Sequence, residues 1–201
     1  MVVKIFTNPV NYRLENCYKD ESDSILIGVE QGAYYALRYG LDLDYVIGDF
    51  DSITETEKKY IDQTARLIKT HPQEKAETDL YLAIKAAIQL DPDEIIIYGG
   101  IGERLDHSYA NILYLKLANI TMTNDKQTMF MLDPGAYVID NHRRYISFFA
   151  IEDIKSLTLS GFKYPLKNHD LNIDDTLCIS NEGSGTLQFK TGLLLVIQSD
   201  L

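Results

Sequence analysis

The hydrophobic periodicity of this 201-residue chain changes once, near residue 124, and this change constrains the fold more than any other feature. Up to about residue 120, short apolar runs alternate with amphipathic stretches, as in a mostly parallel sheet with crossover helices. Beyond that point short β-rich runs follow one another, separated by turn residues. The sequence therefore predicts two domains: an α/β domain over residues 1–125, and an antiparallel β-sandwich or barrel over residues 126–201.

The expected elements can be placed on the chain from local signals. Residues 79–90 form the clearest helix, because apolar side chains recur on one helical face. Thr54 and Glu57 have the spacing of a capping box, which predicts a helix that ends near residue 64. Further helices are expected at 32–39 and from 104 to about 117. Strands are expected at 2–7, 25–29, 45–47, 67–70 and 94–98, and in the second domain at 128–132, 136–139, 145–151, 154–159, 176–179, 186–190 and 193–197.

Composition narrows the classes of partner. Nineteen Lys and Arg against thirty Asp and Glu give a net charge of −11, which disfavours an extended electrostatic contact with nucleic acid. The two cysteines, Cys17 and Cys178, match no metal-binding or redox motif, which favours a reducing compartment. The N-terminus lacks the layout of a signal peptide, and no apolar run reaches the length of a membrane span. We therefore expect a cytoplasmic protein that binds neither nucleic acid nor membranes.

Two aspartates follow the predicted strand at 45–47, in the sequence GDFDS at residues 48–52. Ligands of open α/β sheets bind at the carboxyl ends of the strands. In extended backbone, residues two apart point the same way, so Asp49 and Asp51 are expected to lie together while Phe50 turns inward. Two such carboxylates repel each other unless a cation joins them, and hard oxygen ligands suit Mg²⁺. The alternative interpretation is an Asp-rich turn that only caps the following helix.

Two further segments carry groups suited to phosphate chemistry. Thr78 and Asp79 open the clearest predicted helix, although the helix dipole alone explains an Asp there. The segment GGIGERLDH at residues 99–107 lies between a predicted strand and a helix, a layout that presents backbone N–H groups to an anion. Within it, Arg104 is suited to bidentate contact with phosphate oxygens. The chain contains no P-loop, dinucleotide-binding fingerprint or Gly-x-Ser-x-Gly motif, so the pattern favours a magnesium-dependent enzyme of phosphate chemistry.

Taken in order, these motifs resemble the thiamin pyrophosphokinase family. The likeness runs from about Ile27 to the end, and also rests on Asn111 and on late segments at 157–166, 180–182 and 192–197. It implies transfer of diphosphate from ATP to the hydroxyl of thiamin, giving thiamin diphosphate and AMP. It further implies an α/β domain that binds ATP and Mg²⁺, a β-sandwich domain that binds thiamin, and a homodimer with thiamin between the subunits.

The resemblance also implies roles for individual residues. Asp49, Asp51 and Asp79 would hold the metal, and Arg104 and Asp106 would complete the catalytic set by contacting phosphates or metal. Thiamin would be contacted by Lys75, and by Ser180 and Asn181 acting from the partner subunit. A further set would bind ATP: Glu30, Gly48, Ser52, Thr78, Gly99, Gly102, His107 and Asn111.

Two positions depart from the family pattern, and two other functions stay open. Glu30 stands where Asp is common, and Glu103 stands where Gly is common. A magnesium-dependent phosphohydrolase could use an Asp-x-Asp pair, but that pair normally follows the first strand, and the β-rich domain would have no role. A non-catalytic module that binds thiamin or nucleotide is favoured by Glu30 and Glu103, and is opposed by the intact acidic motifs.

Overall fold

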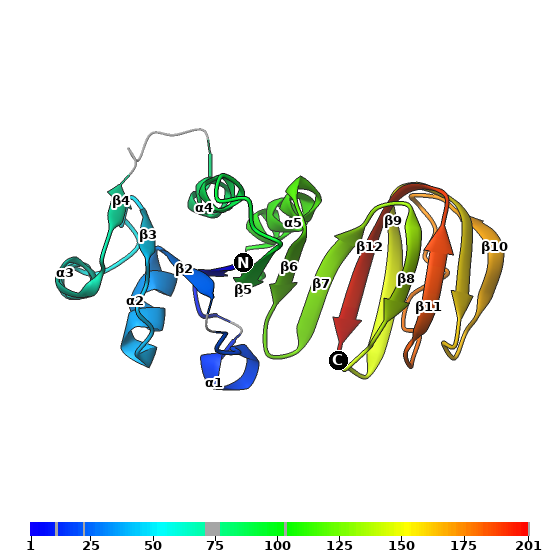
Figure 1. Cartoon of the computed structure of the whole chain (residues 1–201), viewed down its shortest axis with the longest axis horizontal. Coiled ribbons are helices and arrows are strands. Elements are labelled where there is room, and N and C mark those ends of the chain that lie inside the picture. The colour runs from blue at the N-terminus through cyan, green and yellow to red at the C-terminus, as the bar shows by residue number, and fades with distance from the viewer. Residues whose placement is uncertain (11, 22, 71–76, 103, 201) are drawn as a thin grey trace. The chain divides into compact units, whose positions relative to one another are not determined.

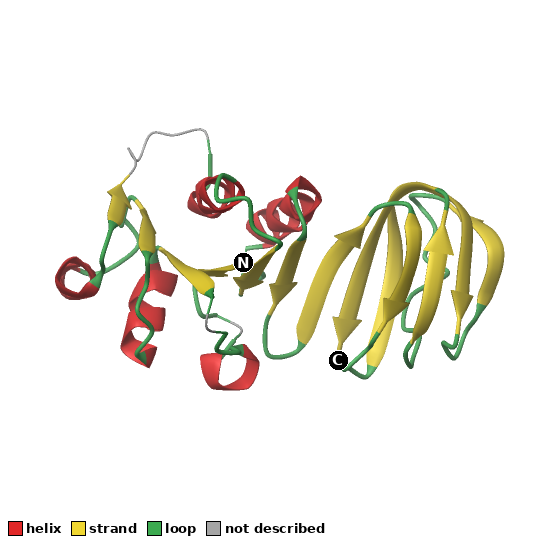
Figure 2. Ribbon diagram, in the orientation of Figure 1, coloured by secondary structure: helices red, strands yellow, loops and turns green. Residues whose placement is uncertain are grey.

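A computed structural model describes residues 1–10, 12–21, 23–70, 77–102 and 104–200. The chain divides into two compact units, Met1–Asp125 and Lys126–Leu201. The helices lie in the first unit, whereas the regular elements within residues 126–200 are all strands (Figures 1 and 2). No helix among the described residues has the length and apolar character needed to cross a membrane. The fold is therefore α/β, with parallel strand pairs in the first unit and antiparallel pairs in the second.

Six parallel strands form the sheet of the first unit, in the order β4-β3-β2-β1-β5-β6. The chain builds outward from β1 to β4 and then returns to β5 on the other side of β1. This reversal creates a topological switch point between β1 and β5, where open α/β sheets form a crevice at the carboxyl ends of their strands. The strands are β1 (Val2–Phe6), β2 (Ser24–Val29), β3 (Tyr45–Gly48), β4 (Ile68–Thr70), β5 (Glu94–Tyr98) and β6 (Ile120–Thr123).

Helices cover both faces of this sheet. Figure 1 shows α4 and α5 on one face and α1 and α2 on the other, and α3 packs against α2. The helices are α1 (Leu14–Cys17), α2 (Gln31–Tyr39), α3 (Glu55–Thr64), α4 (Asp79–Ile88) and α5 (Leu105–Tyr114), followed by a 3₁₀ turn (Leu115–Leu117). The helices and strands expected in this half are confirmed, while α1 and β6 were not expected. The capping box at Thr54 and Glu57 is present, and α2 ends at Gly40 in the left-handed conformation (φ 99°).

An aromatic cluster joins the two strands that flank the switch point. Phe6 at the end of β1 stacks on Tyr98 at the end of β5, with ring centroids 5.1 Å apart. Lys4 of β1 is fully buried beside this cluster, where its ammonium contacts the carbonyl of Lys19 and the Glu21 carboxylate. The Phe6–Tyr98 stack joins the ends of β1 and β5, and the Lys4 contacts tie β1 to the segment that precedes β2.

The second unit is a set of antiparallel strands around one apolar core. Its strands are β7 (Gln127–Leu132), β8 (Gly135–Ile139), β9 (Tyr145–Ser160), β10 (Leu166–Leu171), β11 (Gly185–Phe189) and β12 (Thr191–Ser199). The first half of β9 pairs with β12, and its second half pairs with β10 and β11. Side chains from both halves, including Phe148 and Leu157, meet in the same buried cluster.

Two expectations for the second unit need correction, and one of its strands was not expected. The runs expected at 145–151 and 154–159 are one continuous strand, β9, because the chain passes between its two sets of partners without a turn. The strand expected at 176–179 is wrong: this segment forms turns, with Leu177 and Ile179 exposed and only Cys178 buried. Strand β10 was not expected, because its polar sequence LKNHDL lacks an apolar pattern.

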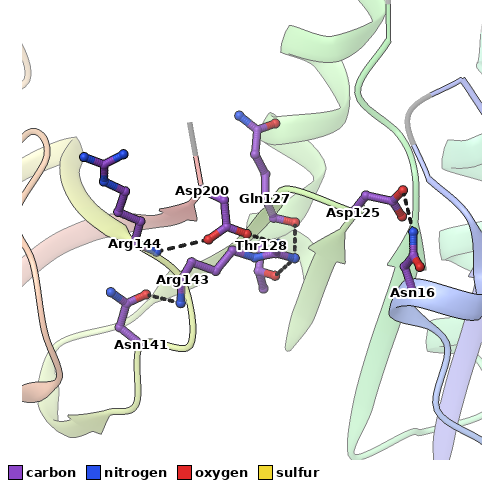
Figure 3. A network of polar contacts seen from close by, with 8 residues as sticks. All are labelled: Asn16, Asp125, Gln127, Thr128, Asn141, Arg143, Arg144 and Asp200. Atoms are coloured by element: carbon purple, nitrogen blue, oxygen red, sulfur yellow. Dashed lines mark hydrogen bonds and ion pairs between the residues drawn. The ribbon is translucent and has the colours of Figure 1, made fainter.

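Within each unit, polar contacts join residues near the ends of strands to other segments of that unit (Figure 3). In the first unit, the side-chain amide of Asn16 donates to Asp125, with a distance of 3.0 Å. In the second unit, Arg143 forms an ion pair with Asp200 at 2.7 Å and donates to the Thr128 hydroxyl. Asp200 also accepts from the backbone N–H of Arg144, so the end of the chain is tied to the start of β9.

Candidate functional site

A cleft of about 500 Å³ opens in the first unit at the carboxyl ends of its strands. It is lined by Thr7 after β1, Glu30 after β2 and Gly100 after β5. Thr7 and Gly100 flank the switch point between β1 and β5, where the strand order places a ligand crevice, and Glu30 follows the strand next to β1. Eight residues predicted to belong to the site line this cleft: Glu30, Ser52, Thr78, Asp79, Gly102, Arg104, His107 and Asn111.

Three carboxylates gather at one side of the site. Oxygen atoms of Glu30, Asp49 and Asp79 all lie within 4.8 Å of one another, and each residue is partly buried. Burial raises the pKa of Glu30 above its usual value, the hydrogen bonds from Phe50 and Ser52 oppose that rise, and the charges of Asp79 and Asp49 add to it. Like charges held this close together favour the binding of a cation.

Residues 48–52, which we call the acidic turn, bring Asp49 to this group. The backbone at Phe50 is left-handed (φ 61°), not extended as the sequence argument assumed. The alternation of side chains therefore does not apply, although Phe50 is buried as expected. Asp51 is exposed, and its backbone N–H donates to Oδ1 of Asp49 at 3.2 Å. The third carboxylate beside Asp49 and Asp79 is therefore that of Glu30, and Asp51 lies outside this group of three.

Glu30 is connected to the acidic turn by both of its carboxylate oxygens. Oε1 accepts from the backbone N–H of Phe50 at 2.9 Å, and Oε2 accepts from the hydroxyl of Ser52 at 3.0 Å. The carboxylate lies so close to Gly48 that a Cβ added there would be 2.0 Å from Oε1. A side chain at position 48 would therefore require the Glu30 carboxylate to move. No ATP contact of Gly48 follows from the geometry.

Asp79 reaches the site from the first turn of α4. Thr78 caps this helix, because its hydroxyl accepts from the backbone N–H of Tyr81 at 3.2 Å. The same hydroxyl lies 3.4 Å from that of Tyr114, which links α4 to α5. The expected helix start is confirmed, and it fixes the direction in which Asp79 points.

Residues 99–102, which we call the glycine loop, are held by side chains of the cleft wall. The N–H of Gly100 donates to the Thr7 hydroxyl at 2.8 Å, and the N–H of Gly102 donates to the Ser108 hydroxyl at 3.1 Å. The side-chain amide of Asn111 donates to the carbonyl of Gly100 at 2.6 Å. The N–H of Gly99 is also used, by the carbonyl of Thr123. These glycine N–H groups are therefore engaged within the protein, contrary to the expectation that they are presented to an anion.

Thr7 and Ser108 are site residues that the sequence did not reveal. Both are nearly fully buried, and both hydroxyls accept from the glycine loop. Thr7 also donates to the carbonyl of Tyr98 at 3.0 Å. A single Thr at the end of an apolar run, or a Ser inside a helix, carries no sequence signal of such a role. Only the neighbouring position of β1 and β5 in the sheet brings Thr7 to this loop.

Arg104 and Asp106 form an exposed ion pair at the start of α5. The distance between Nη2 of Arg104 and Oδ2 of Asp106 is 2.6 Å, and both side chains are about two-thirds exposed (68% and 63%). The hydrogen bond from Arg104 lowers the pKa of Asp106 to about 2. Arg104 and His107 line the cleft, so a positive side chain lies in the same cleft as the carboxylate group. Such a pairing of anionic and cationic groups suits a metal-bound phosphate chain.

Three residues are predicted to contact thiamin, and two of them, Ser180 and Asn181, lie in the second unit. Ser180 is exposed and left-handed (φ 58°). The side chain of Asn181 is buried; its oxygen accepts from the N–H of Tyr164 at 2.9 Å, and its amide donates to the carbonyl of Tyr164 at 2.8 Å. Lys75, the third predicted thiamin contact, lies outside the described residues, and so does Glu103, which departs from the family pattern.

Comparisons with known proteins cover both units. The family model described as thiamin pyrophosphokinase, catalytic domain, matches residues 18–131, and that for the vitamin B1 binding domain of the same enzyme matches residues 136–194. Thiamine pyrophosphokinase of Bacillus subtilis (strain 168) is 41% identical over 193 residues, which is 90% of each chain. The crystal structure of thiamine pyrophosphokinase from Bacillus subtilis matches with a TM-score of 0.92 at 36% identity, covering all of both chains. That from Geobacillus thermodenitrificans gives a TM-score of 0.88 at 29% identity, over 100% of this chain and 98% of that one.

Proposed function

The chain belongs to the thiamin pyrophosphokinase family, as its motifs predicted, and we propose that the cleft of its first unit transfers diphosphate from ATP to the hydroxyl of thiamin. The products are thiamin diphosphate and AMP. ATP is the co-substrate and Mg²⁺ the cofactor.

One observation carries the proposal: three carboxylates meet at a cleft that also holds an arginine. Oxygen donors within 4.8 Å of one another match the preference of Mg²⁺ for hard ligands, and the cleft leaves room for phosphate oxygens and water. We assign metal binding to Asp49 and Asp79, with Asp51 completing the set from the exposed side. When bound there, Mg²⁺ would neutralise phosphate charge, which is most of what phosphoryl transfer requires of an enzyme.

The remaining residues of the cleft position the reacting groups. Arg104, held by Asp106, faces the phosphates with its planar fork, and His107 and Asn111 line the space beside it. The thiamin hydroxyl oxygen forms a bond to the β-phosphorus, while the bond from that phosphorus to the oxygen of AMP breaks. AMP leaves with the electron pair of that bond. The carboxylate of Asp79 accepts the proton of the thiamin hydroxyl late in the step.

We also propose that residues 126–201 form a β-sandwich that binds thiamin and mediates homodimerisation. The common apolar core of its strands supports the sandwich, and the match to a vitamin B1 binding domain supports the ligand. Ser180 and Asn181 are the proposed contacts, together with Lys75 of the first unit. In the dimer, Ser180 and Asn181 act on thiamin at the cleft of the partner. We also propose a cytoplasmic location, in which the free thiols of Cys17 and Cys178 would stay reduced.

The test is to identify the nucleotide product with ATP, Mg²⁺ and thiamin present. We expect AMP in a 1:1 ratio with thiamin diphosphate, and none when thiamin is omitted. ADP with thiamin monophosphate, or phosphate release without thiamin, would exclude the proposal. For the dimer, mixing Asp79→Asn and Ser180→Ala chains should restore part of the activity that each variant lacks. No restoration after mixing and subunit exchange would remove Ser180 from the partner's site.

A further inference from the structure

We infer that Glu30 is a positioning residue, which holds the acidic turn through two hydrogen bonds and thereby keeps Asp49 beside Asp79. Its effect on turnover rests on the proposed function, but its effect on the turn does not. The inference gives a role to a position at which this chain departs from the common Asp of its family.

The hydrogen bonds span the acidic turn. Oε1 of Glu30 accepts from the N–H of Phe50, and Oε2 accepts from the hydroxyl of Ser52. Asp49 precedes Phe50 directly, so this contact fixes the chain on the carboxyl side of Asp49. On its other side, Gly48 lies against the Glu30 carboxylate, where an added Cβ would be 2.0 Å from Oε1. The side chain of Glu30 therefore lies along the turn on both sides of Asp49.

The backbone on both sides of this contact is in an unfavourable conformation. Glu30 and Phe50 have positive φ values of 52° and 61°, which non-glycine residues adopt only when the surroundings enforce them. At Glu30, the N–H donates to the carbonyl of Ile47 in β3, and the carbonyl accepts from Ala33 in the first turn of α2. At Phe50, the aromatic side chain is buried in the core. The bond between Glu30 and Phe50 joins these two constrained residues.

Side-chain length matters more than charge for this role. An aspartate is shorter by one carbon–carbon bond, about 1.5 Å, and from the same backbone cannot reach both Phe50 and Ser52. A glutamine has the same length; its oxygen can accept from Phe50, and its amide can donate to the Ser52 hydroxyl. The Glu30→Gln variant therefore keeps both contacts and removes the charge, whereas Glu30→Asp keeps the charge and loses the contacts.

The experiment compares these two variants with the wild type and with Glu55→Gln, an exposed position in the first turn of α3. Hydrogen exchange of the Phe50 amide is measured by NMR without ligands. The Mg²⁺ activation constant, kcat and the KM for ATP are measured separately. We expect Glu30→Gln to keep Phe50 protection, and to lose less kcat and less Mg²⁺ activation than Glu30→Asp. Glu30→Asp should lose that protection and about 10- to 100-fold in kcat and Mg²⁺ activation, as when a supporting contact of a metal ligand is removed.

Two outcomes would overturn the inference. One is full loss of activity in Glu30→Gln with Phe50 still protected, which would make Glu30 a ligand that acts through its charge. The other is wild-type protection of Phe50 in Glu30→Asp. If the wild type formed no AMP at all, the proposed function would fail, while the exchange result would still decide the role of Glu30 in the turn.

Discussion

The acidic turn and the glycine loop border the same site and differ in how their polar groups are satisfied. In the glycine loop, the hydroxyls of Thr7 and Ser108 and the amide of Asn111 already pair with backbone groups. Beside the acidic turn, carboxylate oxygens of Glu30, Asp49 and Asp79 lie within 4.8 Å of one another, an arrangement that suits a shared cation. The glycine loop is thus shaped by contacts within the protein, whereas the carboxylates supply the negative charge of the site.

Removing charge from the acidic turn should have the largest effect. We expect Asp49→Asn to lower kcat by about 100-fold or more, a loss typical of removing a strong electrostatic contribution to the transition state. Asp51→Asn should also remove most turnover without altering the fold, but less than Asp49→Asn, since Asp51 is exposed and lies outside the group of three. Steady-state rates at equal Mg²⁺, with circular dichroism as the control for folding, check both. Wild-type turnover in Asp49→Asn would refute its metal role.

Changing the cation of the cleft should have the next largest effect. Arg104→Lys keeps the charge and loses the planar fork, so we expect kcat/KM for ATP to fall by about tenfold or more. The hydrogen bond from Arg104 lowers the pKa of Asp106 from 3.8 to about 2, so Asp106 is ionised from pH 8 down to about 5 both with and without the guanidinium. The ratio of wild-type to variant rates should therefore stay constant over that range. Unchanged ATP kinetics would show that Arg104 does not contact the phosphates.

A substitution at Thr7, whose hydroxyl supports the glycine loop, should lower activity less. Thr7→Val keeps the shape of the side chain but leaves the N–H of Gly100 without its acceptor, which costs about 1–3 kcal/mol of stability. We expect a loss of about tenfold in kcat/KM for ATP, as for a supporting contact. Thr7→Ser retains the hydroxyl and serves as the matched control. Equal kinetics in Thr7→Val and Thr7→Ser would mean that the loop keeps its shape without this bond.

The smallest effect is expected for an ion pair within the second unit. Arg143→Met removes the ion pair with Asp200 (Figure 3), and we expect a loss of about 1 kcal/mol and a fall in Tm of about 2–4 °C. The pKa of Asp200 is lowered chiefly by Arg143, so the difference between wild type and variant is present at neutral pH and is lost as the pH falls through that pKa. Thermal unfolding at several pH values checks this. A Tm difference that grows on acidification would contradict the assignment.

The sequence predicted those features that depend on neighbours along the chain. The capping box of Thr54 and Glu57, the cap at Thr78 and the end of α2 at Gly40 are local, and all are confirmed. Asp79 was likewise placed correctly at a helix start. The motifs also identified the family, because their order along the chain carries more information than any one of them.

Features that depend on the sheet could not be read in this way. Asp51 is close to Asp49 in the sequence, yet the left-handed Phe50 turns the chain, and Glu30 takes the third position because β2 and β3 are neighbours. Thr7 reaches the glycine loop only through the pairing of β1 with β5. The β-rich run at 176–179 resembled a strand, although the segment forms turns in which only Cys178 is buried.

The claim that Asp49 and Asp79 bind Mg²⁺ is tested most directly by calorimetric titration with Mg²⁺ in the presence of a non-hydrolysable ATP analogue. The wild type and the Asp62→Asn variant, which changes an exposed residue of α3, should bind with the same affinity. Asp49→Asn and Asp79→Asn should each weaken Mg²⁺ binding by about tenfold or more. Wild-type affinity in both variants would contradict the claim.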